Sequence, residues 1–220
     1  MLNPIQSLES LAQEVLRLSD NLQVRDLVDT RVSEFLEVHG KDTYAWFEEL
    51  TYCLLTAYSS ARLGQLCVDA LCDCDALLGG TVEEIEATLR GQGHRFAARR
   101  AEYIHMARRL APDLKGIIAG FEDSSEARRW LVINVKGLGW KESSHFLRNV
   151  GYMDLAILDR HILADMREHG IIADDGKKGL TRKRYLEYEQ ILMKLAERVE
   201  MSLGELDLYM WYMKTGKVLK

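Results

Sequence analysis

The stretch Asn134–Gly151, NVKGLGWKESSHFLRNVG, places two glycines, Gly137 and Gly139, directly before a new amphipathic segment. On both sides of these glycines, apolar residues recur at the intervals typical of α-helices. Only residues 136–139 separate the two helical patterns, which predicts a tight hairpin between two helices. We expect Leu138 to turn inward between them.

Glycines at positions 137 and 139 leave backbone N–H groups accessible at the start of a helix, where unpaired donors and the helix dipole favour an anion such as phosphate. Gly137, Gly139 and the basic neighbour Lys136 are therefore candidate phosphate-binding residues. An ordinary glycine helix stop predicts the same pattern, so the hairpin alone leaves both interpretations open. Lys141 lies in the first turn of the second helix. The dipole and Lys136 both disfavour its ammonium form, and a neutral lysine amine is a nucleophile.

A second candidate for chemistry is Asp159, which follows the apolar run LAIL at residues 155–158. It occupies an N-cap position before a helix that carries Ile162 and Leu163, and a capping role alone would explain it. Helix N–H groups also stabilise an ionised carboxylate. A fixed anion suits a reaction that builds positive charge on a sugar.

The whole chain has only two prolines, Pro4 and Pro112, and its apolar periodicity predicts helices nearly throughout. After an amphipathic stripe at the N-terminus, the expected helices cover about 22–38, 42–58, 61–77, 82–90, 96–110, 125–135, 140–150, 160–168, 181–199 and 203–214. Gly116, Gly151 and Gly170 are among the expected helix stops. Strand alternation is absent, so the predicted fold class is all-α.

With 220 residues, of which 47% are hydrophobic, the chain is long enough for one unit, 1–220, made of two closely packed lobes. We expect the central lobe at about 45–155, and the second lobe from the N-terminal helices together with about 156–220. No apolar run approaches a membrane span, and the N-terminus has no leader pattern. These features predict a cytoplasmic protein without membrane association, and we expect a monomer.

The net charge of −5 argues against an indiscriminate binder of polyanions. Basic residues nevertheless gather at 95–109, 177–184 and 214–220, which predicts a local cationic face. The chain has four cysteines, at positions 53, 67, 72 and 74. Their spacing does not fit a zinc site, so we expect reduced, structural thiols and no bound metal.

The order of helix, G-L-G hairpin, Lys141 and then Asp159 resembles the helix-hairpin-helix DNA glycosylases. The chain is similar to the short, all-helical 8-oxoguanine DNA glycosylase/AP lyase family of archaea and some bacteria. Segments LLTAYSSARLGQ (54–65) and RFAARRAEYI (95–104) share in the similarity, which covers most of the chain. The resemblance implies a two-lobed helix-hairpin-helix fold with the active-site cleft between the lobes.

The resemblance also implies an activity, namely base excision repair of double-stranded DNA that contains 8-oxoguanine. Lys141 would attack C1′ of a flipped-out nucleotide, expel the oxidised base and form a Schiff base, through which β-elimination cuts the strand. Asp159 would stabilise the oxocarbenium-like sugar. Such an enzyme is a DNA N-glycosylase with AP lyase activity. It requires no cofactor, although the family implies a monovalent cation at the hairpin carbonyls.

Base recognition is expected at the C-terminus. Asp207 and Trp211 lie four residues apart, so they share one helix face, where an acceptor and a stacking surface could meet one base. A rim tryptophan beside a surface acid fits the same spacing. The resemblance implies that both residues line the 8-oxoguanine pocket together with Lys220, whose terminal carboxylate would accept a hydrogen bond. Phe96 is a candidate second stacking surface, although an aromatic residue at helical spacing is also typical of a core.

Contacts with the DNA backbone are expected from two further segments. Arg95, Arg99 and Arg100 are candidates to face phosphates, and a solvated helix face is the alternative interpretation. Tyr58 and Ser59 belong to TAYSSA, which matches a family segment that enters the minor groove. Tyrosine is bulkier than the small polar residue expected there, which leaves the contact to the opposite base open.

Two other functions fit parts of the pattern. An oxidised-pyrimidine glycosylase of the same superfamily would also use a lysine and an aspartate, but those enzymes usually carry an iron–sulfur cluster behind the hairpin. No cysteine follows Gly151 here. A non-catalytic helix-hairpin-helix module would bind duplex DNA in a salt-dependent manner without releasing a base.

Overall fold

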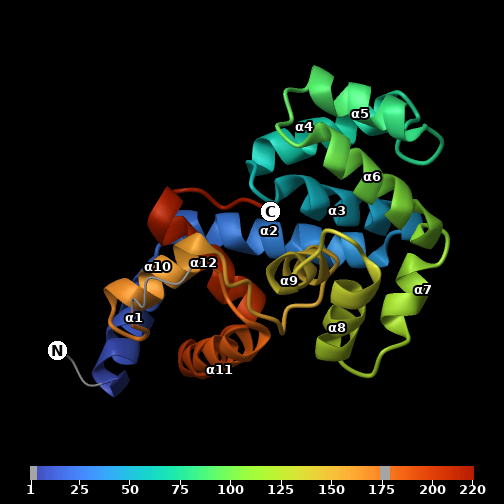
Figure 1. Cartoon of the computed structure of the whole chain (residues 1–220). Helices are drawn as coiled ribbons and strands as arrows, with labels where there is room; N and C mark the ends of the chain where they lie inside the picture. Colours follow the sequence, from blue (N-terminus) through green and yellow to red (C-terminus); the bar gives the residue numbers. More distant parts are fainter. Residues whose placement is uncertain (1–3, 174–178) are drawn as a thin grey trace. The chain divides into compact units, whose positions relative to one another are not determined.

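In the computed structural model, residues 4–173 and 179–220 are described, and every regular element within them is a helix (Figure 1). The predicted all-α class is therefore confirmed. The chain divides into two compact units: Leu36–Val150, and Met1–Phe35 with Gly151–Lys220. We name the first the hairpin unit and the second the terminal unit.

The hairpin unit is built around α3 (Thr43–Thr56), an apolar helix that is buried over most of its length. Asp42 caps this helix by accepting hydrogen bonds from the N–H groups of Tyr44 and Ala45. The other elements of the unit are α4 (Ala61–Asp73), α5 (Val82–Gly91), α6 (Ala97–Ala107), the 3₁₀ turn η1 (Arg108–Leu110), α7 (Leu114–Ala119), α8 (Ser124–Asn134) and α9 (Trp140–Asn149). Because α3 packs against α4, α6, α7 and α9, it supports the second helix of the hairpin directly.

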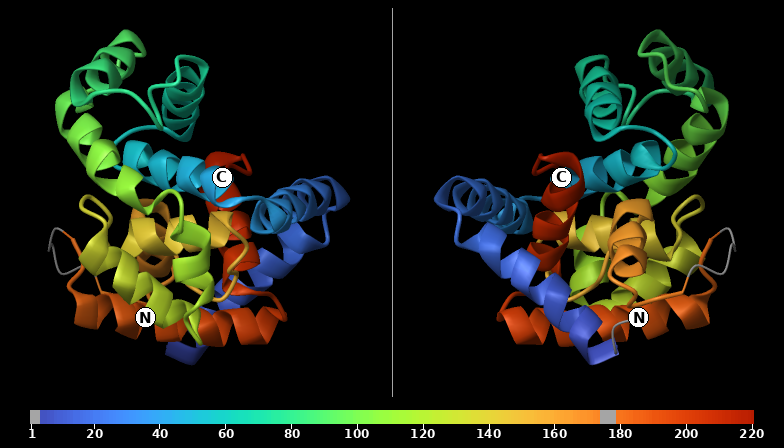
Figure 2. Two further views of the ribbon diagram at one scale, coloured as in Figure 1. Left: turned by 90° about the vertical axis from the view of Figure 1, so that its right-hand side faces the viewer. Right: turned by 90° about the vertical axis from the view of Figure 1, so that its left-hand side faces the viewer.

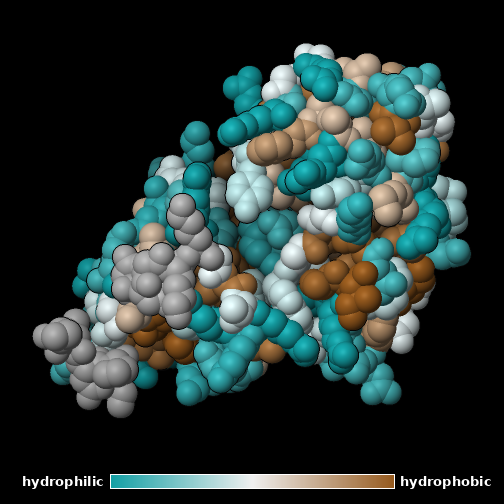
Figure 3. Space-filling model, viewed as in Figure 1, coloured by the Kyte–Doolittle hydropathy of each residue, from teal (hydrophilic) through white to brown (hydrophobic). Residues whose placement is uncertain are grey.

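Helix α5 illustrates how this unit separates its core from its surface. Ile85 and Leu89, four residues apart, are fully buried, whereas Glu83 and Glu84 in the first turn are exposed. Thr81 and Glu84 form a reciprocal capping box at the start of the helix. In the view of Figure 3, hydrophilic and hydrophobic residues are interspersed on the surface over α4 and α5.

The terminal unit joins segments from opposite ends of the chain. Its elements are α1 (Pro4–Ser19), the greater part of α2 (Leu22–Gly40), α10 (Arg160–Glu168), α11 (Arg182–Val199) and α12 (Leu203–Thr215). Helix α1 packs against α11 and α12, and α10 packs against α12, as Figure 1 and the two views of Figure 2 show. Leu11, Val15, Met166 and Leu195 are completely buried in this unit.

Helix boundaries follow the predicted periodicity closely, and α8 to α12 each begin within one residue of the expected position. Gly151 and Gly170 have positive φ angles of 93° and 68°, as expected for helix stops. The expectation for Gly116 is wrong, because this glycine lies inside the short helix α7 (Leu114–Ala119), which the sequence pattern did not predict.

Candidate active site

The hairpin between α8 and α9 depends on Gly137 for two separate reasons. Its φ angle is +100°, a conformation that residues with a side chain rarely adopt. A Cβ atom at this position would also lie 2.3 Å from Cδ2 of Tyr103 and 3.1 Å from Cδ2 of Leu54. Leu138 is 5% exposed, which confirms that it turns into the core between the helices.

Gly139 is the N-cap of α9 and has a φ angle of −97°, so its backbone is not strained. Its N–H group donates a hydrogen bond of 3.3 Å to Oε2 of Glu142. This carboxylate, which the sequence pattern did not predict as part of the site, supplies an acceptor at the same helix end where a phosphate is expected. Other donors of this first turn would therefore carry more of the contact with an anion.

Lys141 is the second residue of α9 and is half-buried, so the predicted placement in the first turn is confirmed. Beneath this turn lies Arg128 of α8, which is only 1% exposed. Its guanidinium carbon lies 4.9 Å from the centre of the Trp140 ring, and its Nη1 donates to Oγ of Ser144 at 3.2 Å. A buried cation is thus stacked on the residue that precedes Lys141. Nothing in the sequence distinguished Arg128 from a surface arginine of an amphipathic helix.

The loop between α3 and α4 presents an exposed aromatic side chain. Tyr58 has a positive φ angle of 63° and is 92% exposed. Its ring lies edge-on to the ring of Phe96, with centroids 6.5 Å apart, and the guanidinium of Arg95 lies 5.2 Å from the Phe96 ring. Phe96 is 37% exposed, so the alternative that it belongs to the core is wrong. Ser59 follows in the same loop and is half-buried.

Arg100 has a different role from the one expected. Its side chain is buried, and Nη2 donates to the carbonyl oxygen of Ala57 at 3.0 Å. Burial lowers the pKa of the Arg100 guanidinium. The expectation that Arg100 faces phosphate is therefore wrong, because this guanidinium holds the loop that carries Tyr58. Arg95 and Arg99 are exposed.

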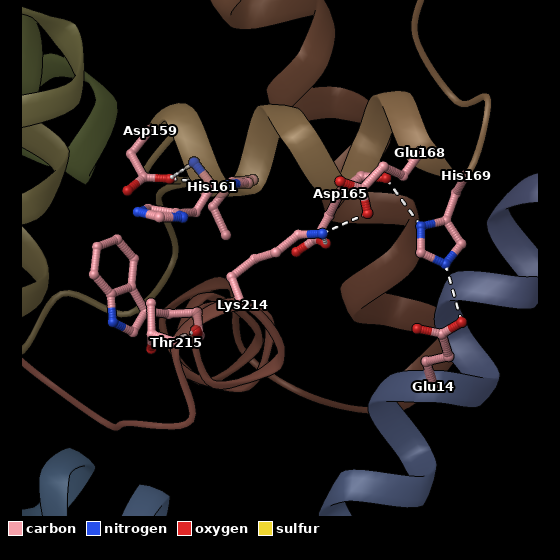
Figure 4. A network of polar contacts seen from close by, with 10 residues as sticks. Glu14, Asp159, His161, Asp165, Glu168, His169, Lys214 and Thr215 are labelled. Atoms are coloured by element: carbon pink, nitrogen blue, oxygen red, sulfur yellow. Dashed lines mark hydrogen bonds and ion pairs between the residues drawn. The ribbon is translucent and has the colours of Figure 1, made fainter.

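In the terminal unit, Asp159 is the N-cap of α10, as predicted. Its Oδ1 accepts hydrogen bonds from the N–H groups of His161 at 2.8 Å and Ile162 at 2.9 Å (Figure 4). The side chain is half-buried. Because both helix amides bond one oxygen, the direction of the carboxylate is set by the start of the helix.

Asp207 and Trp211 lie on the face of α12 that is packed toward α10. Asp207 is 8% exposed and borders a small cavity together with Ile162 and Met210, so the alternative of a surface acid is wrong. The ring of Trp211 meets that of His161 edge-on, with centroids 4.6 Å apart. Its indole N–H is buried, and no residue in the described parts of the chain accepts from it. Lys220, at the C-terminus, is half-buried.

The sequence profile of the Ogg-HhH family, 8-oxoguanine DNA glycosylase, matches residues 28–201. The chain belongs to this family. It is 47% identical over 200 residues to an 8-oxoguanine DNA glycosylase/AP lyase from Methanocaldococcus jannaschii. This alignment covers 91% of this chain and 95% of the relative. A relative with the same name from Korarchaeum cryptofilum is 44% identical over 212 residues, covering 96% and 99% of the two chains.

Solved structures of other family members are similar throughout. The glycosylase/lyase of M. jannaschii in complex with a 15-mer DNA containing 8-oxoguanine is 44% identical, with a TM-score of 0.90, and the match covers 96% of this chain and all of that one. The 8-oxoguanine DNA glycosylase of Thermotoga maritima is 41% identical, with a TM-score of 0.86 over 97% of this chain.

A charged network in this family member connects the helix of Asp159 to the helix of Trp211 (Figure 4). Nζ of Lys214 in α12 lies 2.8 Å from Oδ1 of Asp165 in α10 and also pairs with Glu168. Asp165 is 1% exposed, and burial raises its pKa despite the opposing effect of Lys214. The hydrogen bond to Asp165 in turn raises the pKa of Lys214.

The cysteines of this glycosylase family member are free thiols, and Cys53 and Cys67 are buried. Burial raises the pKa of Cys67 to about 11, which makes it a poor nucleophile. Among residues 4–173 and 179–220, no group of three or more His, Cys, Asp or Glu side chains could hold a metal ion. Within the same residues, no helix is long and apolar enough to span a bilayer. Of the predicted basic segments, residues 177 and 178 lie outside the described part.

Proposed function

We propose that this protein excises 8-oxoguanine from double-stranded DNA and cleaves the strand at the resulting abasic site by β-elimination. The observation that carries the proposal is the position of Lys141, directly after a hairpin whose conformation excludes any side chain at position 137, in a chain of this family. We further propose that the protein acts as a monomer.

The proposed reaction uses two side chains of this protein. The neutral amine of Lys141 attacks C1′, and the glycosidic bond breaks with its electron pair leaving on the base, which takes up a proton. Asp159 stabilises the positive charge that develops on the sugar. The lysine nitrogen loses a proton, and O4′ takes one up as the C1′–O4′ bond breaks, which gives an imine between Lys141 and C1′. Loss of a proton from C2′ then expels the 3′ phosphate, and hydrolysis of the imine restores the lysine.

Recognition of the base is assigned to α12 and the residues that follow it. Trp211 would stack on the purine, and Asp207 would accept a hydrogen bond from a purine N–H group. The burial of Asp207 supports this role, because a desolvated acceptor discriminates strongly between partners. Lys220 would also contact the base.

Contacts with the rest of the duplex are assigned to the hairpin unit. Gly137, Gly139 and Lys136 would hold a phosphate, with a monovalent cation at the hairpin carbonyls. Tyr58, Phe96 and Arg95 form one exposed cluster, in which the aromatic rings would stack on bases and the guanidinium would meet a phosphate. The half-buried Ser59, which follows Tyr58 in the same loop, would contact the duplex beside this cluster. The left-handed backbone of Tyr58 is a strained conformation of the kind that gathers at functional sites.

Borohydride reduction tests the proposal directly, because it converts an imine between lysine and DNA into a stable adduct. The wild-type protein should form the adduct on a duplex containing 8-oxoguanine, and Lys141→Gln should form none. Lys136→Gln is the matched control, since it should weaken DNA binding while keeping the adduct at saturating protein. A wild-type protein that forms no adduct, or an undiminished adduct in Lys141→Gln, would contradict the proposed function.

A panel of duplexes in one sequence context distinguishes the lesion. Excision of 8-oxoguanine should exceed that of oxidised pyrimidines and of undamaged guanine. Preference for an oxidised pyrimidine would replace the proposed substrate while leaving the lysine chemistry in place.

A further inference from the structure

The backbone that leads to Asp159 is buried without belonging to a helix or a sheet. Leu155, Ala156, Ile157 and Leu158 are each no more than 5% exposed. Buried N–H and carbonyl groups outside regular structure need hydrogen-bond partners from elsewhere in the molecule, since leaving them unpaired is costly.

Two side chains of α11 supply those partners. The hydroxyl of Tyr185 donates to the carbonyl oxygen of Ala156 at 2.7 Å and accepts from the N–H group of Leu158 at 3.3 Å. Oε1 of Glu189 accepts from the N–H group of Ala156 at 3.0 Å. Tyr185 and Glu189 are one helical turn apart, on the same face of α11, and are only 3% and 5% exposed. We call this pair the α11 clamp.

The clamp acts on the residues that immediately precede the catalytic candidate. Asp159 is fixed on one side by the first turn of α10, through its bonds to two helix amides. On the other side its backbone continues into Leu158, which Tyr185 holds, and its own N–H group donates to the carbonyl of Ile157 at 3.0 Å. The position of the Asp159 carboxylate therefore depends on α11 as well as on its own helix.

We propose that Tyr185 and Glu189 are positioning residues for Asp159, which hold its carboxylate where the transition state requires it. This inference rests on the proposed function. A displacement of a catalytic group by about 1 Å can lower the rate of a reaction by about a hundredfold. Neither residue touches the substrate in this proposal, because both act through the backbone of residues 156–158.

Tyr185→Phe is the most selective perturbation, because it removes one oxygen atom and keeps the ring. Tyr188→Phe is the matched control: it makes the same change three residues further along α11, where the half-buried hydroxyl accepts from Nη2 of Arg184 at 2.6 Å. Single-turnover excision of 8-oxoguanine should fall by about tenfold to a hundredfold in Tyr185→Phe with little change in substrate affinity. The control should stay near the wild-type rate.

The decisive measurement repeats Tyr185→Phe in an Asp159→Asn background. If the clamp acts through Asp159, the second substitution should add little once the carboxylate is gone. Multiplicative rate losses, or equal rates in Tyr185→Phe and Tyr188→Phe, would overturn the proposal. All rates are compared well below the unfolding temperature of each variant, so that loss of folded protein does not imitate loss of positioning.

Glu189 provides a second route if Tyr185→Phe does not fold. Glu189→Gln keeps an acceptor for the Ala156 N–H group and should retain most activity, whereas Glu189→Leu removes it and should lose excision. Equal activity in these two variants would also overturn the proposal.

Amide hydrogen exchange tests the clamp without any activity. Exchange at Leu158 should accelerate in Tyr185→Phe and not in Tyr188→Phe, and unchanged exchange would refute the clamp itself. If exchange responds as expected but the wild-type protein excises no 8-oxoguanine, the failure lies in the proposed function, and the positioning role fails with it.

Discussion

Replacing Gly137 by alanine tests whether the hairpin geometry depends on the absence of a side chain. Two penalties apply at this position. The residue has a φ angle of +100°, and the new methyl group would lie 2.3 Å from Cδ2 and 2.8 Å from Cε2 of Tyr103. Both neighbouring atoms belong to a ring, which cannot give way as the end of a flexible side chain could.

The size of the effect follows from these two terms. A residue with a side chain in a sparsely populated backbone region costs roughly 1–3 kcal/mol. Inserting a methyl group into a packed site typically costs about 1–3 kcal/mol more. We therefore expect Gly137→Ala to lower the free energy of unfolding by roughly 2–6 kcal/mol, a large part of the about 5–15 kcal/mol that is usual for a folded domain.

Two other glycines of the hairpin unit allow the backbone penalty and the packing penalty to be measured separately. Gly93 has a φ angle of +80°, and no atom lies within 4 Å of the place that a methyl group would occupy, so Gly93→Ala should show the backbone penalty alone. Gly91, at the end of α5, has neither a positive φ angle nor a near neighbour. Gly91→Ala should be neutral or stabilising by up to about 1 kcal/mol, because alanine favours helix.

Urea unfolding followed by circular dichroism measures all three variants. The expected order of midpoints is Gly91→Ala highest, then Gly93→Ala, then Gly137→Ala. A midpoint for Gly137→Ala equal to that of Gly93→Ala would show that contact with Tyr103 adds nothing. A midpoint equal to that of Gly91→Ala would refute both parts of the reasoning.

Three further substitutions have defined outcomes. Asp159→Asn should change the free energy of unfolding by less than about 0.5 kcal/mol, since asparagine caps helices as well as aspartate does. The rate of single-turnover excision should nevertheless fall by about 100-fold or more. Retained excision would show that Asp159 has no part in the mechanism. Lys214→Met leaves Asp165 buried without its ammonium partner and should cost roughly 3 kcal/mol at pH 8. Burial raises the pKa of Asp165 above its value in the unfolded chain, so the folded protein takes up a proton at this carboxyl as the pH falls. The loss of stability in Lys214→Met relative to wild type should therefore be smaller at pH 5 than at pH 8. A decrease in Tm that is the same at both pH values would contradict this. Arg128→Lys should lower the free energy of unfolding, measured by urea denaturation, by roughly 1–3 kcal/mol, because a lysine cannot reproduce the planar contact with Trp140. An unchanged urea midpoint would show that this contact does not contribute to stability.

Helices were predictable because their signals are local. The start of α9 at Trp140 follows from a glycine immediately before a periodic apolar pattern, and the start of α10 follows from the capping aspartate at position 159. Helix α7 was missed for the same reason, since its residues, LKGIIA, are too few for a period to emerge and contain Gly116. Tertiary packing, rather than local preference, sustains such a short helix.

The surroundings of the candidate site were not predictable, because they come from residues distant in sequence. Arg100 bonds a carbonyl 43 residues away, and Tyr185 bonds one 29 residues away. In a helical sequence, a polar residue that serves a buried backbone looks the same as one that faces water. Only the requirement that buried backbone groups be paired identifies these residues, and that requirement applies once the path of the chain is known.

The difference between polar residues that bond the buried backbone and those that face water also matters for the net charge of −5, in a family whose members are DNA glycosylases. Several cations of this chain are engaged internally. The half-buried Arg108 donates to the carbonyls of Ala76, Leu77 and Gly80, and the buried Arg100 donates to the carbonyl of Ala57. Counting basic residues in the segment 95–109 therefore overstates the charge available to phosphates. We therefore expect affinity for a DNA duplex to depend on few ionic contacts, and the net negative charge of the chain is no argument against DNA as the substrate.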